Sequence, residues 1–112
     1  MKLRYTPEAI ADIREIKTYI HDSLHNPNAA KRISKMILDH CAQLKVFPKM
    51  GVDLGSVLGV ETDIRMLVRE NYVAIYRCDH DMVSVSRVFN AKQDFLRLLF
   101  GADAFDRLNE TE

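Results

Sequence analysis

The stretch that decides the fold lies at residues 64–94 and reads IRMLVRENYVAIYRCDHDMVSVSRVFNAKQD. It contains three runs rich in Val, Ile and Tyr that have the length and composition of β-strands. Arg-Glu-Asn at 69–71 and Asp-His-Asp at 79–81 separate these runs, and both have the residue types of tight turns. We therefore predict a meander of three antiparallel strands over this stretch.

Two amphipathic helices are expected before the meander. Apolar residues recur at spacings of three and four between residues 10 and 24, and again between residues 30 and 44. Each helix should begin at a capping residue followed by proline, Thr6-Pro7 in the first and Asn26-Pro27 in the second. Because only a short Asn/Pro break separates them, the two helices should form an antiparallel hairpin with a shared apolar side.

These elements and the remaining segments predict an α+β fold. Residues 2–6 alternate between polar and apolar side chains, which is typical of a short strand. The glycine-rich residues 49–62 are expected to form a loop, and residues 92–100 a short C-terminal helix. We expect the helix hairpin to cover one face of an antiparallel sheet, built from the N-terminal strand and the meander, and the other face to be wet.

Length and composition indicate one domain. The chain has 112 residues, enough for one core, and we assign residues 1–100 to the domain and 101–112 to an acidic, flexible tail. Sixteen basic and sixteen acidic side chains cancel, so no net field draws the protein to nucleic acid. Two cysteines are too few for a disulfide framework or a zinc ribbon. No signal peptide or apolar run of spanning length is seen, so we expect a cytoplasmic protein without a membrane partner.

Several cations interrupt or follow the apolar runs of the meander. Arg65 and Arg87 are candidate catalytic residues, and Arg65, Arg77, Arg87 and Lys92 are candidate target-binding residues. For Arg65 and Arg87 a structural role is an equal alternative, through hydrogen bonds to buried carbonyl groups or to Asp94.

The direction of the Arg87 side chain leaves two further alternatives. Arg87 is an even number of residues from Val83 and Val85, so strict alternation along the strand would point the arginine to the same side as these valines. Either a β-bulge intervenes or the arginine is partly buried.

His21 and His25 have a spacing that can hold a metal, but no third ligand is evident, and we assign no metal site.

The order of elements and several short motifs resemble the RelE/ParE superfamily of bacterial toxins. The segments that carry the resemblance are YTPEAIADIREIKTYI at 5–20, NPNAAKRI at 26–33, FPKMG at 47–51, Ile64-Arg65, Asn71-Tyr72, Tyr76-Arg77 and Arg87-Val88. The resemblance covers roughly residues 2–95 and is closer to the ParE-like members.

This resemblance implies the toxin of a type II toxin–antitoxin module, of the kind that stabilises plasmids, with a cognate antitoxin as partner. ParE-like members act on DNA gyrase, and we expect this chain to inhibit growth by binding gyrase, without chemistry of its own and without a cofactor. The first alternative is a RelE-like, metal-independent endoribonuclease that acts on mRNA at the translating ribosome. The second is a degenerate, non-toxic protein that only binds an antitoxin.

The residues themselves favour the non-nuclease alternative. RelE-like nucleases resemble one another in placing lysines on the first meander strand and an arginine directly after the tyrosine of the second. Here the first strand carries Ile64, Met66 and Val68, and Val73 follows Tyr72.

Two kinds of surface are expected to receive the antitoxin. One is an apolar groove between the helix hairpin and the sheet edge, and the other is an exposed edge strand. Leu96, Leu99 and Phe100 are the candidate antitoxin-binding residues, the alternative being that they pack as core. Homodimerisation is left open.

Overall fold

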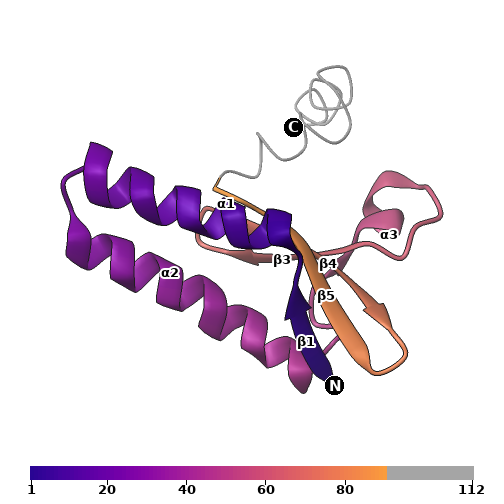
Figure 1. Ribbon diagram of the computed structural model, residues 1–112. Helices are drawn as coiled ribbons and strands as arrows, with labels where there is room; N and C mark the ends of the chain where they lie inside the picture. The colour runs from indigo at the N-terminus through magenta and orange to yellow at the C-terminus, as the bar shows by residue number, and fades with distance from the viewer. Residues whose placement is uncertain (91–112) are drawn as a thin grey trace.

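The computed structural model describes residues 1–90, and they contain a five-stranded sheet with the order β1-β5-β4-β3-β2 (Figure 1). The strands are β1 Lys2–Tyr5, β2 Val52–Asp53, β3 Arg65–Arg69, β4 Tyr72–Asp79 and β5 Met82–Phe89. β3, β4 and β5 pair in antiparallel order, so the predicted meander is confirmed.

The N-terminal strand joins the sheet in the other direction. β1 pairs with β5 in parallel, from Lys2 opposite Met82 to Tyr5 opposite Val85. The expectation of a wholly antiparallel sheet is therefore wrong at this edge. Both helices and two meander strands separate β1 from β5, and such a long connection lets the chain return in the same direction.

The two helices form the predicted hairpin. α1 spans Pro7–Thr18 and continues into a short π-helix, η1 Tyr19–Ser23, while α2 spans Pro27–Ala42 and ends in a 3₁₀ turn, η2 Gln43–Lys45. The side-chain oxygens of Thr6 and Asn26 accept hydrogen bonds from the backbone N–H groups three residues ahead, both at 3.1 Å. The two capping predictions are thus confirmed.

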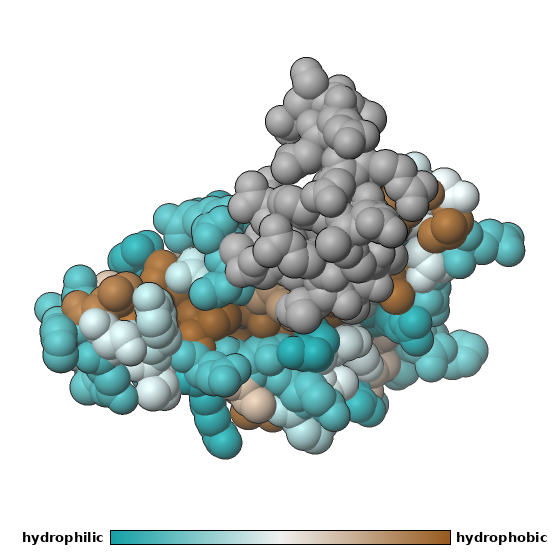
Figure 2. Space-filling model, turned by 90° about the horizontal axis from the view of Figure 1, so that it is seen from above, coloured by the Kyte–Doolittle hydropathy of each residue, from teal (hydrophilic) through white to brown (hydrophobic). Residues whose placement is uncertain are grey.

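Each face of the sheet has its own apolar cluster. α1 and α2 pack on one face, where the core is made by apolar side chains of both helices and of the sheet. The other face carries a smaller cluster under the short helix α3 Leu54–Leu58 (Figure 1), formed by Leu54, Val73, Ile75 and Phe89. The prediction that this face is wet is therefore wrong over part of its area, because the glycine-rich segment folds back as β2 and α3 and supplies apolar cover. Apolar side chains are also exposed near α3 (Figure 2), with Val57 and Val60 both more than half exposed.

A β-bulge in β5 sets the direction of Arg87. Ile75 lies opposite Arg87, but the next residue of β4, Tyr76, lies opposite Val85, which leaves Ser86 as an extra residue. Arg87 is consequently exposed while Val85 and Val88 are buried. Of the two alternatives for this arginine, the bulge is confirmed. The expected helix at 92–100 and the tail at 101–112 lie outside the described residues.

Candidate functional site

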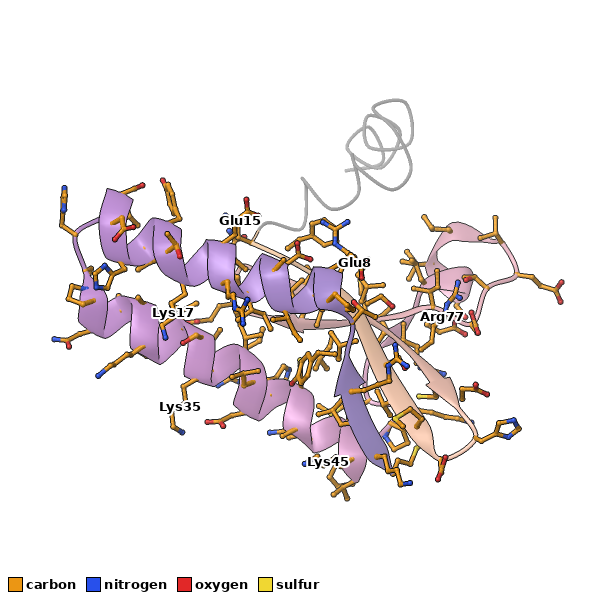
Figure 3. The ribbon with its side chains drawn as sticks, viewed as in Figure 1. Glu8, Glu15, Lys17, Lys35, Lys45 and Arg77 are labelled. Atoms are coloured by element: carbon orange, nitrogen blue, oxygen red, sulfur yellow. The ribbon has the colours of Figure 1, made fainter. Side chains whose placement is uncertain are left out.

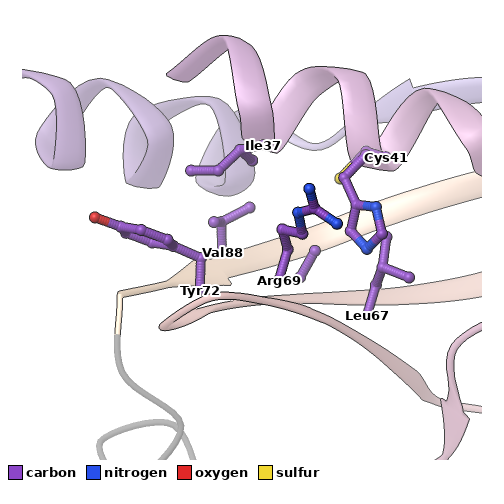
Figure 4. A pocket seen from close by; sticks show the side chains of 8 residues that line it. Ile37, Cys41, Leu67, Arg69, Tyr72 and Val88 are labelled. Atoms are coloured by element: carbon purple, nitrogen blue, oxygen red, sulfur yellow. The ribbon is translucent and has the colours of Figure 1, made fainter. Parts of the chain in front are cut away.

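A groove runs between α2 and the β3–β4 hairpin (Figure 4). Side chains of α2 form one wall, and those of β3, β4 and the end of β5 form the other. Most of the lining residues are apolar, and His40, Arg69 and the Tyr72 hydroxyl supply the polar groups. The lining residues are Ile37, His40, Cys41, Leu67, Arg69, Tyr72, Ala74 and Val88. We call this feature the α2–β3 groove.

A polar pocket continues the groove along α2. It shares His40 and Arg69 with the groove and adds Met36, Asp39 and Gln43. The cavity volume of the groove is only about 10 Å³, so it offers a shallow apolar strip, and the polar pocket beside it, with about 200 Å³, has room for hydrogen-bonding and charged groups. This combination suits an amphipathic partner segment.

Burial and nearby charges shift the pKa values of two side chains in the groove. Burial lowers the pKa of His40, the positive charge of Arg69 lowers it further, and a hydrogen bond to the backbone of Val68 acts in the opposite direction. Burial also raises the pKa of Tyr72, helped by Glu70 and opposed by Arg32. At neutral pH the groove thus presents a neutral imidazole, a phenol and one guanidinium cation.

The outer edge of β3 lacks a strand neighbour beside this groove, although His40 forms a hydrogen bond with the backbone of Val68. The short strand β2 pairs only with Arg65 and Met66, so residues 67–69 have no strand neighbour on their outer side within residues 1–90. An unpaired strand edge presents N–H and C=O groups to an added strand. A groove and a strand edge, the two kinds of surface expected from the sequence to receive an antitoxin, thus lie next to each other at Arg69.

Arg65 is held by backbone carbonyl groups. Its Nη1 donates to the oxygens of Gly51 at 2.9 Å and Lys49 at 3.3 Å. The hydroxyl of Tyr76 accepts a hydrogen bond from the backbone N–H of Gly51 at 2.9 Å. Arg65 and Tyr76 together fix the loop that follows α2, so the structural alternative for Arg65 has a clear physical basis.

Arg87 is held by Asp12 of α1. Its Nε and Nη2 donate to the two carboxylate oxygens at 2.8 Å and 3.2 Å. The same carboxylate accepts the backbone N–H of Val88 at 2.9 Å, and the guanidinium lies 5.0 Å from the ring centroid of Phe89. Hydrogen bonding to Asp12 raises the pKa of Arg87. Asp12 is the partner that the described residues give to this arginine, while Asp94, named as an alternative from the sequence, lies outside the described residues.

Asp12 and Thr6 together close the edge of β5 beyond the end of β1. The backbone N–H of Thr6 donates to the oxygen of Val85 at 3.0 Å, and its hydroxyl donates to that of Ser86 at 2.8 Å. Asp12 then receives the N–H of Val88. Side chains of α1 and its cap thus replace the missing strand neighbour, which explains why an arginine and an aspartate meet here.

The arginines proposed for target binding are not gathered at one point. Arg77 pairs with Asp63 at 3.2 Å, on the side of the sheet away from α1 and α2 (Figure 3). Arg65 binds the 49–51 loop and Arg87 binds Asp12. Each of the three is engaged by a different partner, so no shared cationic centre forms among them.

The remaining predicted site residues, Lys92, Leu96, Leu99 and Phe100, lie outside the described residues. Sequence reasoning missed the groove residues His40, Arg69 and Tyr72 as members of one site. The position of His40 beside the apolar stripe of α2 was a usable signal. The contact of His40 with the edge of β3 had no signal in the sequence, because it depends on how the helix hairpin packs on the sheet.

Residues 1–90 offer neither a metal site nor a membrane-spanning helix. No three His, Cys, Asp or Glu side chains gather there in a way that could hold a metal ion. In the same part of the chain, no helix combines the length and apolar character needed to cross a membrane. Cys41 and Cys78 are both free thiols.

The fold is that of a class of small α+β proteins with solved members. A solved structure described as "Chromosomal ParDE TA system from P. aeruginosa" superposes with a TM-score of 0.67 at 21% sequence identity, over 82% of this chain and 97% of that chain. A search of curated proteins found no match to this chain.

The sequence places the chain within that class. Residues 3–95 match the family described as "ParE toxin of type II toxin-antitoxin system, parDE". The chain therefore belongs to the ParE toxin family, which confirms the resemblance to the RelE/ParE superfamily.

Proposed function

We propose that this protein inhibits growth in the cytoplasm by binding DNA gyrase, and that a cognate antitoxin neutralises it. The observation that carries the proposal is the match to the ParE toxin family over residues 3–95. Gyrase is the target that the resemblance to ParE-like members implies. Arg65, Arg77, Arg87 and Lys92 stay the candidate target-binding residues, with Arg77 the most available of the described three because its partner among residues 1–90 is the exposed carboxylate of Asp63.

The antitoxin is proposed to bind at the α2–β3 groove. Three features support this assignment: a shallow apolar strip, a polar pocket beside it, and an edge of β3 without a strand neighbour at residues 67–69. An amphipathic segment can lay apolar side chains against the strip and place a carboxylate near Arg69. Leu96, Leu99 and Phe100 remain further candidates for contact with the antitoxin.

The nuclease alternative finds less support in the described residues. Cleavage through the ribose 2′-hydroxyl needs a base, an acid and cations that converge on one phosphate. Arg65 and Arg87 are bound to different partners, and the position after Tyr72 is the fully buried Val73. A protein that works by binding does not need such convergence.

The proposal is tested by expressing the protein from an inducible promoter, with and without the small reading frame next to its gene. We expect growth arrest that the neighbouring product reverses. Primer extension on messages from a translating extract should show no new cuts when the purified protein is added. Cuts at the ribosomal A site would establish the RelE-like alternative, and unaffected growth would establish the degenerate one.

The groove assignment has its own variant. Arg69→Glu should keep the growth arrest but escape neutralisation, because it places a negative charge where an acidic antitoxin group would bind. Arg14→Glu, at an exposed position of α1, is the matched control and should be neutralised like the wild type. Equal neutralisation of the two variants would show that the antitoxin binds elsewhere.

A further inference from the structure

A row of polar side chains crosses three strands on the sheet face opposite α1 and α2. Ser84 of β5 is in register with Arg4 of β1 on one side and with Arg77 of β4 on the other. The residues that alternate with them, such as Val83 and Tyr76, belong to the helix-side core, so these three point to the opposite face. We call this feature the Arg4–Ser84–Arg77 row.

The spacing of the row suits an anion between the two arginines. Adjacent strands lie about 4.8 Å apart, so the backbones of Arg4 and Arg77 are separated by roughly 10 Å with Ser84 midway. The serine side chain is short and half-buried, and it leaves the space above it to the longer arginines. Its hydroxyl can donate a hydrogen bond to a group held there.

The cations of this face have weak or no partners within the protein. Arg4 and Lys2 are exposed, and neither side chain makes a hydrogen bond or ion pair with any other residue of the described part. Arg77 pairs with Asp63 at 3.2 Å, but the two side chains are 55% and 69% exposed. An exposed pair of this kind is weak, and a competing carboxylate can displace Asp63.

We propose that the Arg4–Ser84–Arg77 row binds an acidic segment of the protein target. Carboxylates of that segment pair with Arg4 and replace Asp63 on Arg77, each through the parallel hydrogen bonds that a guanidinium offers. This inference rests on the proposed function, and it adds the chemistry of the target surface and two residues, Lys2 and Arg4, to the candidate set.

An acidic protein surface fits the row better than nucleic acid does. The chain as a whole has no net charge, and Asp63 and Asp79 lie beside the row, where they would repel a continuous phosphate backbone. A protein segment can instead place single carboxylates at the two arginines and avoid the two aspartates.

The test uses the full chain, the double variant Arg4→Gln/Arg77→Gln and the control Arg14→Gln. Poly-L-glutamate at low salt probes the row itself, purified DNA gyrase probes the target, and a single-stranded RNA oligonucleotide probes binding to nucleic acid. We expect the double variant to bind poly-L-glutamate and gyrase at least about tenfold more weakly than the wild type, since two charge-assisted contacts are lost, while Arg14→Gln behaves as wild type. Thermal unfolding confirms that both variants fold.

The outcomes separate the inference from the proposed function. If the double variant binds poly-L-glutamate and gyrase as well as Arg14→Gln does, the row is not a binding surface and the inference is wrong. The wild type could fail to bind gyrase while the double variant still binds poly-L-glutamate more weakly than the wild type does. In that case gyrase is the wrong target, and the row remains a binding site for acidic segments. Loss of binding to single-stranded RNA alone, with poly-L-glutamate unaffected, would overturn the inference in favour of nucleic acid.

Discussion

Replacing Asp12 is expected to be among the most damaging changes of a polar residue in this protein. Its carboxylate, 12% exposed, accepts hydrogen bonds from Arg87 Nε, Arg87 Nη2 and the backbone N–H of Val88 at 2.8, 3.2 and 2.9 Å. Asp12→Ala removes all three and leaves the Val88 N–H without an acceptor at the end of the sheet edge. We therefore expect a large loss in the free energy of unfolding.

The magnitude follows from the burial of each partner. A hydrogen bond to a charged group contributes about 1.5–3 kcal/mol, whereas an exposed ion pair contributes about 1 kcal/mol or less. The Arg87 side chain is 46% exposed, so most of the loss belongs to the Val88 N–H. We predict a decrease of about 2–3 kcal/mol for Asp12→Ala and less than about 1 kcal/mol for Arg87→Ala.

Urea unfolding at neutral pH measures both changes. Asp39→Ala is the matched control, because Asp39 also lies in a helix and pairs with a lysine, Lys35, but both side chains are exposed; it should leave the unfolding midpoint unchanged. High salt should reduce the effect of Arg87→Ala and leave most of that of Asp12→Ala. A loss for Asp12→Ala no larger than that for Arg87→Ala would refute the assignment of the Val88 bond as the main contribution.

Three further predictions concern the core and the groove. Gly51→Ala should destabilise the protein by about 2 kcal/mol or more in urea unfolding, because its Cβ would lie 2.6 Å from the Tyr76 hydroxyl; Gly59→Asn, with nothing within 4 Å of the added Cβ, is the control, and equal losses would contradict the close approach. In a thiol titration at mildly alkaline pH, Cys78 should react before unfolding and Cys41 only after it, because Cys41 is 1% exposed and burial raises its pKa to about 11; rapid reaction of both thiols would contradict this. The lowered pKa of His40 means that the unfolded chain takes up a proton first as the pH falls below 6.5, so stability should decrease there and His40→Gln should flatten this part of the profile; an unchanged profile would contradict it.

Much of the fold was predictable because its signals are local. Thr6-Pro7 and Asn26-Pro27 start the two helices through a side-chain cap and a preset proline, and neither effect depends on distant residues. The positions of the two meander turns were likewise predictable from their polar residues, although the positive φ of Glu70 is not a conformation that its own residue type favours.

The parallel pairing of β1 was not predictable in the same way. Alternation between residues 2 and 6 identifies a strand but not the strand that it pairs with. The pairing of β1 with β5 depends on how α1 packs against β5. The same holds for β2 and α3, where glycines indicated a loop although apolar residues such as Leu54 cover the second sheet face.

The site was predicted only in part, because function here depends on partners brought together by the fold. The position of Arg87 relative to Val83 and Val85 predicted a β-bulge as one of two alternatives, and the bulge is present. Nothing in the sequence indicated that Asp12, 75 positions away, is the partner of this arginine. Arg4 was overlooked for the same reason, since its alignment with Arg77 requires the parallel pairing of β1.

The central claim is that this member of the ParE toxin family acts by binding gyrase. Supercoiling of relaxed plasmid by purified gyrase, followed as purified protein is added, tests it most directly. We predict inhibition that rises with the amount of protein and disappears when the antitoxin is added first. Full supercoiling at a molar excess of a folded, growth-arresting protein would contradict the account.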